Sequence, residues 1–393
     1  MATRRGVKMT EQYSLFDLPG NEKYKPKESR EWDWKLSDLD KVQKNGLKVF
    51  SCFACGGGST MGYKLAGCDV IGCCEIDPKM NEVYVKNHNP KYNYIMDIRE
   101  FNKLDNLPEE LYNLDILDGS PPCTTFSMAG DREKSWGKKK KFREGQAEQT
   151  LDDLSFVFIE TVAKLRPKIV IMENVEGLLM GAAWDYVKKI YTEFHQAGYK
   201  LAHWLLKGEH MGIPQARHRV FFIAARNDIG FNPCDLDMTF NYKAITYGEI
   251  KKGVGLSVTP ECQKLLEAAQ PQDKNLSDIK ERLGQKPGRF NEKLAWKDRT
   301  LSTIATRCGV YDAPELSFIS NDSIIRASTF PSDYDFIKTT PSRVKYICGM
   351  SVPPLMIKRV VEKLLEKKEQ IFGGAGERAG TYEKREHRQQ PKR

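Results

Sequence analysis

The sequence lacks any run of about eighteen apolar residues, the length that a membrane-spanning helix needs. Its N-terminus also lacks the basic stretch followed by an apolar stretch that marks a secretory signal. With 393 residues and 40% hydrophobic content, the chain is long enough to bury a large core. These features argue against a membrane protein and predict a globular protein of the cytoplasm.

The ten cysteines do not have the spacing of a disulfide framework, and several fall in strand-like runs, where reduced cysteine packs as a small apolar residue. Cys52 and Cys55 form one C-x-x-C pair, but no second pair with zinc-ligand spacing follows. The sequence therefore favours free thiols and no metal site. It also contains no internal repeat.

Acidic residues are in the minority, because 62 lysines and arginines face 53 aspartates and glutamates, a net charge of +9. Such an excess suits a polyanionic partner, since basic side chains that neutralise phosphates release condensed counterions. Basic residues crowd the segment from Arg132 to Arg143. That segment is either a nucleic-acid-binding loop or a solvated surface loop.

From Lys48 onward, apolar strand-like runs alternate with helical stretches such as Leu154 to Leu165, where apolar residues recur at three-to-four spacing. The predicted strands span 48–53, 70–74, 94–96, 115–117, 169–172 and 220–224. Continuous apolar strands between helices indicate an α/β fold with a largely parallel sheet and helices on both faces.

Composition divides the chain into five parts. A polar extension, 1–46, is expected to be flexible and to stay outside the main core, and 47–226 carries the alternating pattern of the large domain. The regularity fades in 227–324, which predicts a separate small domain. Apolar helical character returns in 325–372, which is expected to complete the large domain, while 373–393 has the composition of a disordered basic tail.

Cys123 follows two prolines just after the strand-like run that ends at Asp118. Proline fixes its own φ and favours an extended residue before it, so Pro121 and Pro122 would aim the Cys123 sulfur in a nearly predetermined direction. The arrangement predicts a nucleophile.

Glycines and acidic residues mark the ends of the first three strands. Gly56, Gly57 and Gly58 follow the first strand and open a helix, where they would let the backbone approach a ligand closely. Glu75 and Asp97 end the second and third strands, where a carboxylate can bind the ribose hydroxyls or adenine of a nucleoside cofactor. Each could also be an ordinary surface carboxylate.

Arg217 and Arg219 alternate along a strand-like segment, so both guanidinium groups could enter one pocket. The alternative is a solvated sheet edge.

Four blocks occur in a fixed order: Pro-Pro-Cys at 121–123, Met-Glu-Asn-Val at 172–175, Gln-Ala-Arg-His-Arg at 215–219 and Gly-Met-Ser-Val-Pro-Pro at 349–354. With them the chain resembles the DNA (cytosine-5) methyltransferase family from about Leu47 to about Leu364. The resemblance implies an S-adenosylmethionine-dependent methyltransferase fold with a small target-recognition domain. It implies methyl transfer to carbon 5 of a flipped-out cytosine in a specific duplex DNA sequence.

The resemblance also implies the roles of particular residues. Cys123 would be the nucleophile, Glu173 would engage nitrogen 3 of cytosine, and Asn174 would brace the Pro-Pro-Cys loop. Arg217 and Arg219 would bind the cytosine carbonyl and brace the loop. The cofactor-binding residues would be Phe53, Ala54, Gly57, Gly58, Glu75, Ile76, Asp97, Ile98, Pro122, Leu154, Ser351 and Val352.

Three positions depart from the family pattern. Ser51 replaces the usual aspartate ahead of the glycine-rich loop, Cys55 stands where the family usually has glycine, and Met350 stands where it usually has asparagine.

Partners follow from the same resemblance. Double-stranded DNA would be read by the region from Arg226 to Asp298, by a protein expected to be a monomer. The segment Gln12 to Phe16 resembles the peptide by which bacterial replication and repair proteins dock on the sliding clamp, although its apolar residues could instead pack on the body.

Three other functions stay open at this point. A tRNA methyltransferase of the same chemistry is disfavoured, because the Cys-Phe-Thr tripeptide of that branch is absent from the sequence. A silent DNA-binding relative would have no reason to keep all four catalytic residues. An amino-group methyltransferase would carry an aromatic residue in place of Cys123. The sequence does not distinguish a restriction-modification enzyme from an orphan or phage-borne one.

Overall fold

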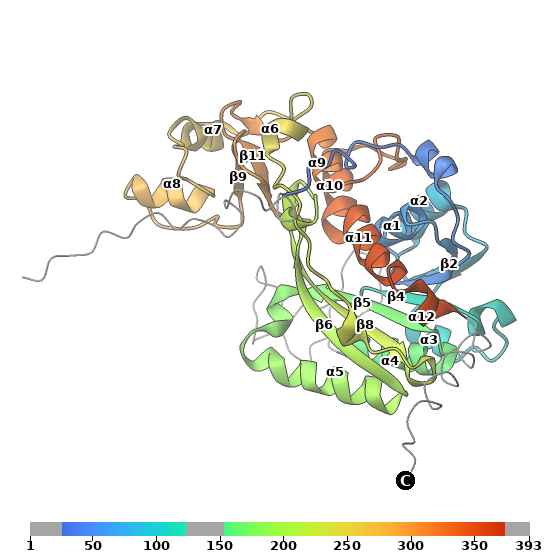
Figure 1. Ribbon diagram of the computed structural model, residues 1–393. Coiled ribbons are helices and arrows are strands. Elements are labelled where there is room, and N and C mark those ends of the chain that lie inside the picture. Colours follow the sequence, from blue (N-terminus) through green and yellow to red (C-terminus); the bar gives the residue numbers. More distant parts are fainter. Residues whose placement is uncertain (1–25, 123–152, 374–393) are drawn as a thin grey trace, which may run out of the picture.

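The computed structural model describes residues 26–122 and 153–373. Its centre is a seven-stranded sheet in the order β3-β2-β1-β4-β5-β8-β6 (Figure 1). The strands are β1 (Lys48–Cys52), β2 (Asp69–Glu75), β3 (Tyr92–Ile95), β4 (Ile116–Gly119), β5 (Ile169–Val175), β6 (Tyr199–Lys207) and β8 (His218–Arg226). Pairing is parallel from β3 through β5, whereas β8 runs antiparallel to both of its neighbours. The predicted largely parallel sheet is confirmed.

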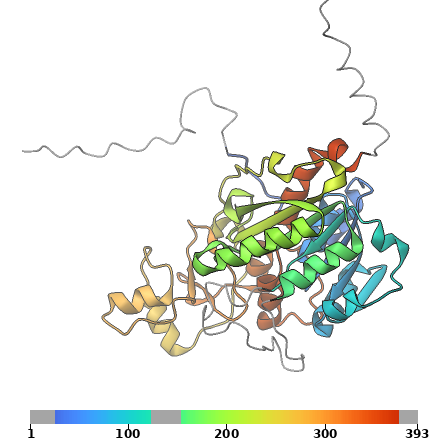
Figure 2. The same ribbon diagram turned by 90° about the horizontal axis from the view of Figure 1, so that it is seen from below.

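Helices cover both faces of this sheet, as predicted (Figures 1 and 2). One face carries α1 (Gly58–Leu65), α10 (Pro341–Met350) and α11 (Pro354–Leu365), and the other carries α3 (Ile98–Asn102), α4 (Leu154–Leu165) and α5 (Trp184–Gln196). The helix α2 (Pro78–His88) follows β2, and α12 (Lys368–Phe372) follows α11.

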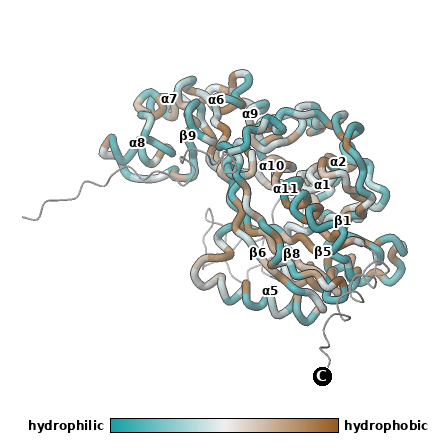
Figure 3. Tube along the Cα trace, viewed as in Figure 1, coloured by the Kyte–Doolittle hydropathy of each residue, from teal (hydrophilic) through white to brown (hydrophobic). Residues whose placement is uncertain are grey.

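Alternation along the strands explains why there are two cores. Val49 packs in the α1–α11 core, whereas its neighbour Phe50 packs in the α3–α5 core. Ile116 and Leu117 on β4 divide in the same way, because successive side chains of a strand point to opposite faces. A strand buried on both faces is apolar along most of its length, and the strands of the sheet are accordingly largely brown in the hydropathy view (Figure 3).

A smaller unit projects from the end of the sheet (Figure 1). Its elements are α7 (Pro260–Glu267), α8 (Leu276–Arg282), β9 (Lys293–Ala295), β11 (Val310–Asp312) and β12 (Ser317–Phe318). The helices α6 (Tyr247–Ile250) and α9 (Asn321–Ala327) connect it to the large domain, because Ile250 and Ile324 pack in the α1–α11 core. Leu266, Ile279 and Tyr311 belong to a separate hydrophobic cluster within the small unit. Two short strands, β7 (Gln215–Ala216) and β10 (Leu301–Ser302), pair with each other and join the small unit to the start of β8.

The N-terminal extension differs from expectation. Residues 26–46 do not stay outside the main core, because Trp32 and Trp34 are buried in it. The Trp34 indole donates to the Thr329 carbonyl at 2.8 Å, and Glu31 pairs with Arg359 at 2.6 Å. The polar composition concealed this packing, because two tryptophans are enough to anchor a mostly polar segment.

The described residues also show the state of the cysteines and the character of the helices. All nine cysteines of the described ranges are free thiols, as predicted. Within these ranges no helix is long and apolar enough to cross a membrane.

Candidate active site

Three residues of the glycine-rich loop between β1 and α1 have a left-handed backbone conformation. Phe53, Cys55 and Gly57 have φ values of 56°, 46° and 81°. A side chain costs roughly 1–2 kcal/mol in this conformation, which explains why glycine suits position 55. The Cys55 N–H donates to Glu75 Oε2 at 2.7 Å, so the acid at the end of β2 holds the loop in place.

Glu75 is 8% exposed, and its second oxygen accepts from the Asp77 N–H at 2.8 Å. Burial raises the pKa of Glu75, while the hydrogen bonds from the Asp77 and Cys55 backbone oppose that rise. Each carboxylate oxygen has two lone pairs, so both retain capacity for a further donor.

The chain returns over this loop after α10. A Cβ atom on Gly58 would lie 2.3 Å from the Val352 carbonyl oxygen and 2.7 Å from Ser351 Cβ, so only glycine permits this contact. Residues 51–59 and 349–352 are far apart in sequence, yet Ala54, Gly58, Ser351 and Val352 line one cavity of about 270 Å³.

The opposite wall of that cavity carries the predicted catalytic side chains. Glu173 lies near the end of β5, and its Oε1 is 2.8 Å from Arg219 Nε on β8. Arg217 is 2% exposed and donates from both terminal nitrogens to the Gly349 carbonyl at 3.1 Å. Burial lowers the pKa of Arg217 to about 9, and the neighbouring Arg219 charge adds to this. The prediction that both arginines enter one pocket is confirmed, and the solvated-edge alternative is wrong.

The approach to Cys123 is described, but Cys123 itself and the basic segment after it lie outside the described residues. Pro121 and Pro122 line the cavity with Glu173. Asn174 Nδ2 donates to the Pro121 carbonyl at 3.3 Å, which agrees with the expected bracing of this loop.

A second, smaller cavity adjoins the first through Phe53, Ile76 and Pro122, which line both. It adds Met96, Asp97, Ile98 and Leu154, so it is an apolar slot with one carboxylate at its edge. Asp97 caps α3 by accepting from the Arg99 N–H at 2.8 Å, and it also pairs with the Arg99 guanidinium. An apolar slot beside one acceptor fits an adenine ring with its amino group, so these residues fit the nucleoside end of S-adenosylmethionine.

One predicted cofactor residue, Gly57, does not line either cavity. A Cβ on Gly57 would lie 2.2 Å from the buried His88 ring, so Gly57 lets the loop pack closely on α2.

Sequence reasoning missed Asp118, a fully buried carboxyl group on β4. The signal was an aspartate that directly follows the apolar pair Ile116 and Leu117 within the predicted strand region.

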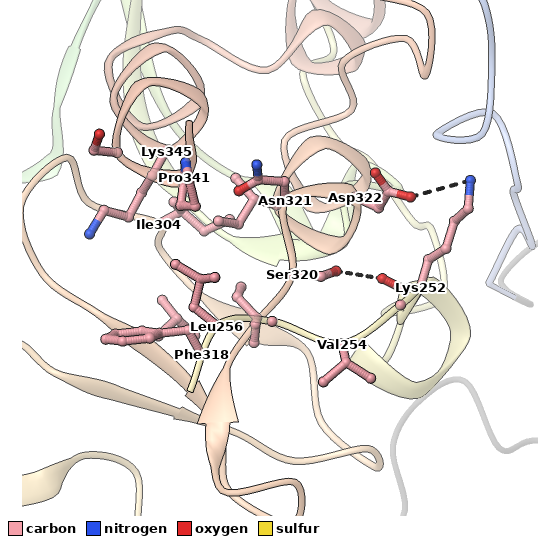
Figure 4. A pocket seen from close by; sticks show the side chains of 16 residues that line it. Lys252, Val254, Leu256, Ile304, Phe318, Ser320, Asn321, Asp322, Pro341 and Lys345 are labelled. Atoms are coloured by element: carbon pink, nitrogen blue, oxygen red, sulfur yellow. Dashed lines mark hydrogen bonds and ion pairs between the residues drawn. The ribbon is translucent and has the colours of Figure 1, made fainter. Parts of the chain in front are cut away.

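Another cavity, of about 420 Å³, lies where the segment 252–256 of the small unit meets α9 and α10 (Figure 4). Its walls are mainly apolar, with Leu256, Ile304 and Phe318 among them, and Lys252 pairs with Asp322 at its rim. It shares no lining residue with the cavity around Glu173. No metal-binding group of three or more His, Cys, Asp or Glu residues occurs in the described ranges either.

A sheet in this order with β8 reversed, a glycine-rich loop after β1 and acids at the ends of β2 and β3 define the S-adenosylmethionine-dependent methyltransferase fold. The model of the C-5 cytosine-specific DNA methylase family matches residues 47–366, and the chain belongs to that family. Enzymes of this family use S-adenosylmethionine as the methyl donor.

Relatives and solved structures agree with this assignment. The type II methyltransferase M.FnuDI of Fusobacterium nucleatum is 31% identical over 51% of this chain, and the match spans 53%, about half, of the relative's length. M.NgoFVII of Neisseria gonorrhoeae is 26% identical over 89% of this chain and 93% of its own. A putative DNA modification methyltransferase from an Escherichia coli prophage superposes with a TM-score of 0.57 at 17% identity, covering 82% of this chain and 99% of that one. Spodoptera frugiperda DNMT2 superposes with a TM-score of 0.58 at 15% identity, covering 81% and 100%.

Proposed function

We propose that the chain transfers a methyl group from S-adenosylmethionine to carbon 5 of a flipped-out cytosine in a specific duplex DNA sequence, through a covalent intermediate at Cys123. The observation that carries this proposal is a single cavity. Pro122, Glu173 and Arg219 line it together with Ala54 and Gly58 of the glycine-rich loop.

The reaction requires a nucleophile because carbon 5 of cytosine is itself too weak to attack a methyl donor. A Cys123 thiolate bonds to carbon 6 and makes the ring an enamine, which activates carbon 5. When bound, S-adenosylmethionine supplies the electrophilic methyl group. Loss of the carbon 5 proton then re-forms the ring double bond as the bond between sulfur and carbon 6 breaks.

Attack at carbon 6 moves negative charge toward nitrogen 3 and the ring carbonyl. Fixed donors stabilise such charge better than mobile ones, because they need no rearrangement during the reaction. We assign Glu173 to nitrogen 3, where its carboxyl group would supply a proton, and Arg219 to the carbonyl as a hydrogen-bond donor, because their 2.8 Å contact fixes both side chains against the same wall. Arg217, held by the Gly349 carbonyl, braces the return segment.

The cofactor assignments rest on the two adjoining cavities. We assign Glu75 to the ribose hydroxyls, and Asp97 with Ile98 and Leu154 to the adenine, because these residues line the two cavities. Phe53, Ala54, Gly58, Ile76, Pro122, Ser351 and Val352 complete the walls.

A cytosine in a duplex must leave the base stack to reach this cavity, which costs a few kcal/mol of unpairing and unstacking. We assign sequence reading to the region from Arg226 to Asp298. Docking of Gln12 to Phe16 on a sliding clamp, a monomeric state, a cytoplasmic location and a restriction-modification role stay predictions. The segment Gln12 to Phe16 lies outside the described residues.

The deciding experiment incubates the protein with tritiated S-adenosylmethionine and randomised duplex DNA that contains 5-fluorocytosine. The fluorine replaces the proton that must leave, so the covalent complex accumulates. We expect a denaturation-resistant protein–DNA adduct with wild type and with Cys234→Ser, which changes an exposed cysteine. Cys123→Ser should form none.

Other results would overturn the proposal in different ways. Labelling of tRNA without a DNA adduct would indicate an RNA methyltransferase. No labelling of either nucleic acid would indicate a silent binding protein. An adduct with Cys123→Ser would show that a different residue is the nucleophile.

A further inference from the structure

Asp118 is a buried carboxyl group directly behind the active site. It lies on β4 with 1% of its surface exposed, and the chain runs from it through Gly119 and Ser120 to the two prolines. Asp118 Oδ2 accepts from Ser51 Oγ at 2.7 Å, and Oδ1 accepts from the Tyr63 hydroxyl at 3.1 Å. The mechanism proposed above does not use this group.

The position is an expensive one for a carboxyl group. Ile116 and Leu117 on the same strand are fully buried, and an acid among them loses its hydration. Burial raises the pKa of Asp118 to about 7, and the nearby Glu173 adds to the rise, while the Ser51 and Tyr63 hydroxyls oppose it. An apolar residue would stabilise the sheet better, so the carboxyl group serves something other than stability.

Its partners show what it connects. Ser51 is on β1, two residues before Phe53, where the glycine-rich loop begins. Tyr63 is on α1, the helix that this loop opens. Asp118 itself precedes the Pro-Pro-Cys segment by three residues. One carboxyl group therefore ties the strand before the cofactor loop and the helix after it to the start of the catalytic loop.

The location of this acid also accounts for a departure from the family pattern. Position 51 usually holds an aspartate, but here it is Ser51, and its Cα partner on the neighbouring parallel strand is Asp118. Adjacent strands are about 4.8 Å apart, so the acid has moved by one strand and still occupies the same level of the sheet. Ser51 compensates as a donor to the relocated carboxyl group.

We propose that Asp118 is a positioning residue for methyl transfer, which holds the cofactor loop and the Pro-Pro-Cys loop in register, and that the Ser51–Asp118 pair is an exchanged form of the family's aspartate at position 51. If the Ser51–Asp118 pair is such an exchanged form, a protein that carries both Ser51→Asp and Asp118→Ser should keep its function. The proposal rests on the function proposed above for its effect on turnover, but its effect on cofactor binding can be measured separately.

The test is an exchange cycle of four proteins: wild type, Asp118→Ser, Ser51→Asp and the double exchange. We would measure the Kd for S-adenosylmethionine by calorimetry, kcat on DNA and the thermal midpoint. Asp118→Ser leaves two buried hydroxyls without their acceptor, and Ser51→Asp puts two carboxyl groups side by side. Each single variant should weaken cofactor binding and lower kcat by about tenfold or more, because small displacements of reacting groups are costly. The double exchange should return both values to within about threefold of wild type.

Asp115→Ser is the matched control, directly before the same strand. Asp115 is also largely buried and accepts from the Lys48 N–H at 2.9 Å and Lys168 Nζ at 2.7 Å, but it lies just before β4, at the opposite end from the catalytic loop. This control should lower the thermal midpoint and leave Kd and kcat unchanged. If Asp118→Ser does not fold, Asp118→Asn takes its place in the cycle, since its amide keeps one acceptor oxygen.

Two results would overturn the proposal. Wild-type Kd and kcat in a folded Asp118→Ser protein would show that the residue only contributes to stability. A folded double exchange that stays as impaired as the single variants would show that the two positions are not interchangeable. If wild type binds the cofactor but does not methylate DNA, the proposed function fails, while the Kd cycle still decides the role of Asp118 in holding the cofactor loop.

Discussion

The sheet edge formed by the end of β5 and the start of β8, where Glu173 and Arg219 lie, differs from the small unit in what its buried charges contact. At the sheet edge, Glu173, Arg217 and Arg219 are buried or partly buried, yet all three line an open cavity. In the small unit, buried Asp273 pairs with Arg282 at 2.6 Å, and buried Asp312 pairs with Lys251 at 2.7 Å. None of these four residues lines either cavity at the site. Buried charge at the sheet edge can thus meet a ligand, whereas in the small unit it holds loops together.

The largest contrast is expected between Glu173→Gln and Asp273→Asn. Loss of the Glu173 carboxyl group should lower kcat about 100-fold or more, because the glutamine cannot supply a proton to nitrogen 3, where negative charge develops. Asp273→Asn should leave kcat within about twofold and destabilise the fold by about 3 kcal/mol, since it leaves Arg282 without its buried partner. Methylation assays and thermal unfolding of both variants measure the two effects. A loss of kcat in Asp273→Asn would contradict the distinction between the two regions.

Two glycines, Gly58 at the cofactor cavity and Gly253 in the small unit, should differ in the same way, with a smaller effect on function. Gly58→Ala places a Cβ 2.3 Å from the Val352 carbonyl oxygen, so it should push the return segment away and weaken cofactor binding about tenfold. Gly253→Ala in the small unit meets nothing within 4 Å, although its φ is +71°. It should cost about 1 kcal/mol of stability and leave cofactor binding unchanged. Calorimetric titration with S-adenosylmethionine separates the two, and equal Kd values would refute the close contact at Gly58.

A pH series tests how the buried acid on β4 affects stability. The pKa of Asp118 is raised from 3.8 to about 7, so between these values the folded state binds more protons than the unfolded state. Its contribution to stability is therefore fully present below about pH 4 and is lost as the pH rises toward 7, by up to a few kcal/mol. Asp118→Asn should remove this part of the slope in unfolding free energy against pH, measured by urea denaturation. An unchanged slope would mean that another group titrates there.

The smallest effect is expected at Cys55. Its φ of 46° suits glycine, so Cys55→Gly should change stability by less than about 1 kcal/mol, with relief of strain offset by the entropy of the unfolded chain. Cys55→Val should be destabilised by about 2 kcal/mol, since a β-branched residue tolerates this conformation poorly. Thermal unfolding of the two variants measures the difference. Equal stability would show that the loop relaxes to a right-handed path.

Much of the large domain could be predicted because its signals are local. Buried strands read as apolar runs, and α4 begins and ends where the apolar spacing placed it. The strand β6 was missed because it carries polar residues at the edge of the sheet, such as Lys200 and His203. The burial of residues 26–46 could not be predicted from their polar composition, because it depends on Trp32 and Trp34, and the Trp34 indole meets the Thr329 carbonyl 295 positions later in the chain.

The local sequence indicates candidate site residues where residue type and strand end coincide, as for Glu75 and Asp97, whereas Glu173 followed from the resemblance to the family. The pairing of Arg217 with the Gly349 carbonyl could not be predicted, because nothing in the local sequence states which distant carbonyl a buried guanidinium meets. Asp118 was missed for the same reason, because its role depends on its contact with Ser51 on the neighbouring strand, which the local sequence does not reveal. The sequence of the small unit contains no motif that assigns a role to any of its residues.

The return of the chain over Gly58 has a consequence for folding. The roof of the cofactor cavity is Ser351 and Val352, and α11 behind them packs on α1, so the first and last parts of the large domain must meet before the cavity exists. Contacts between such distant segments form slowly, because a long loop must close first. During synthesis, the apolar face of α1 therefore waits for nearly the whole chain, and this interval is when the protein is most exposed to aggregation and to chaperones.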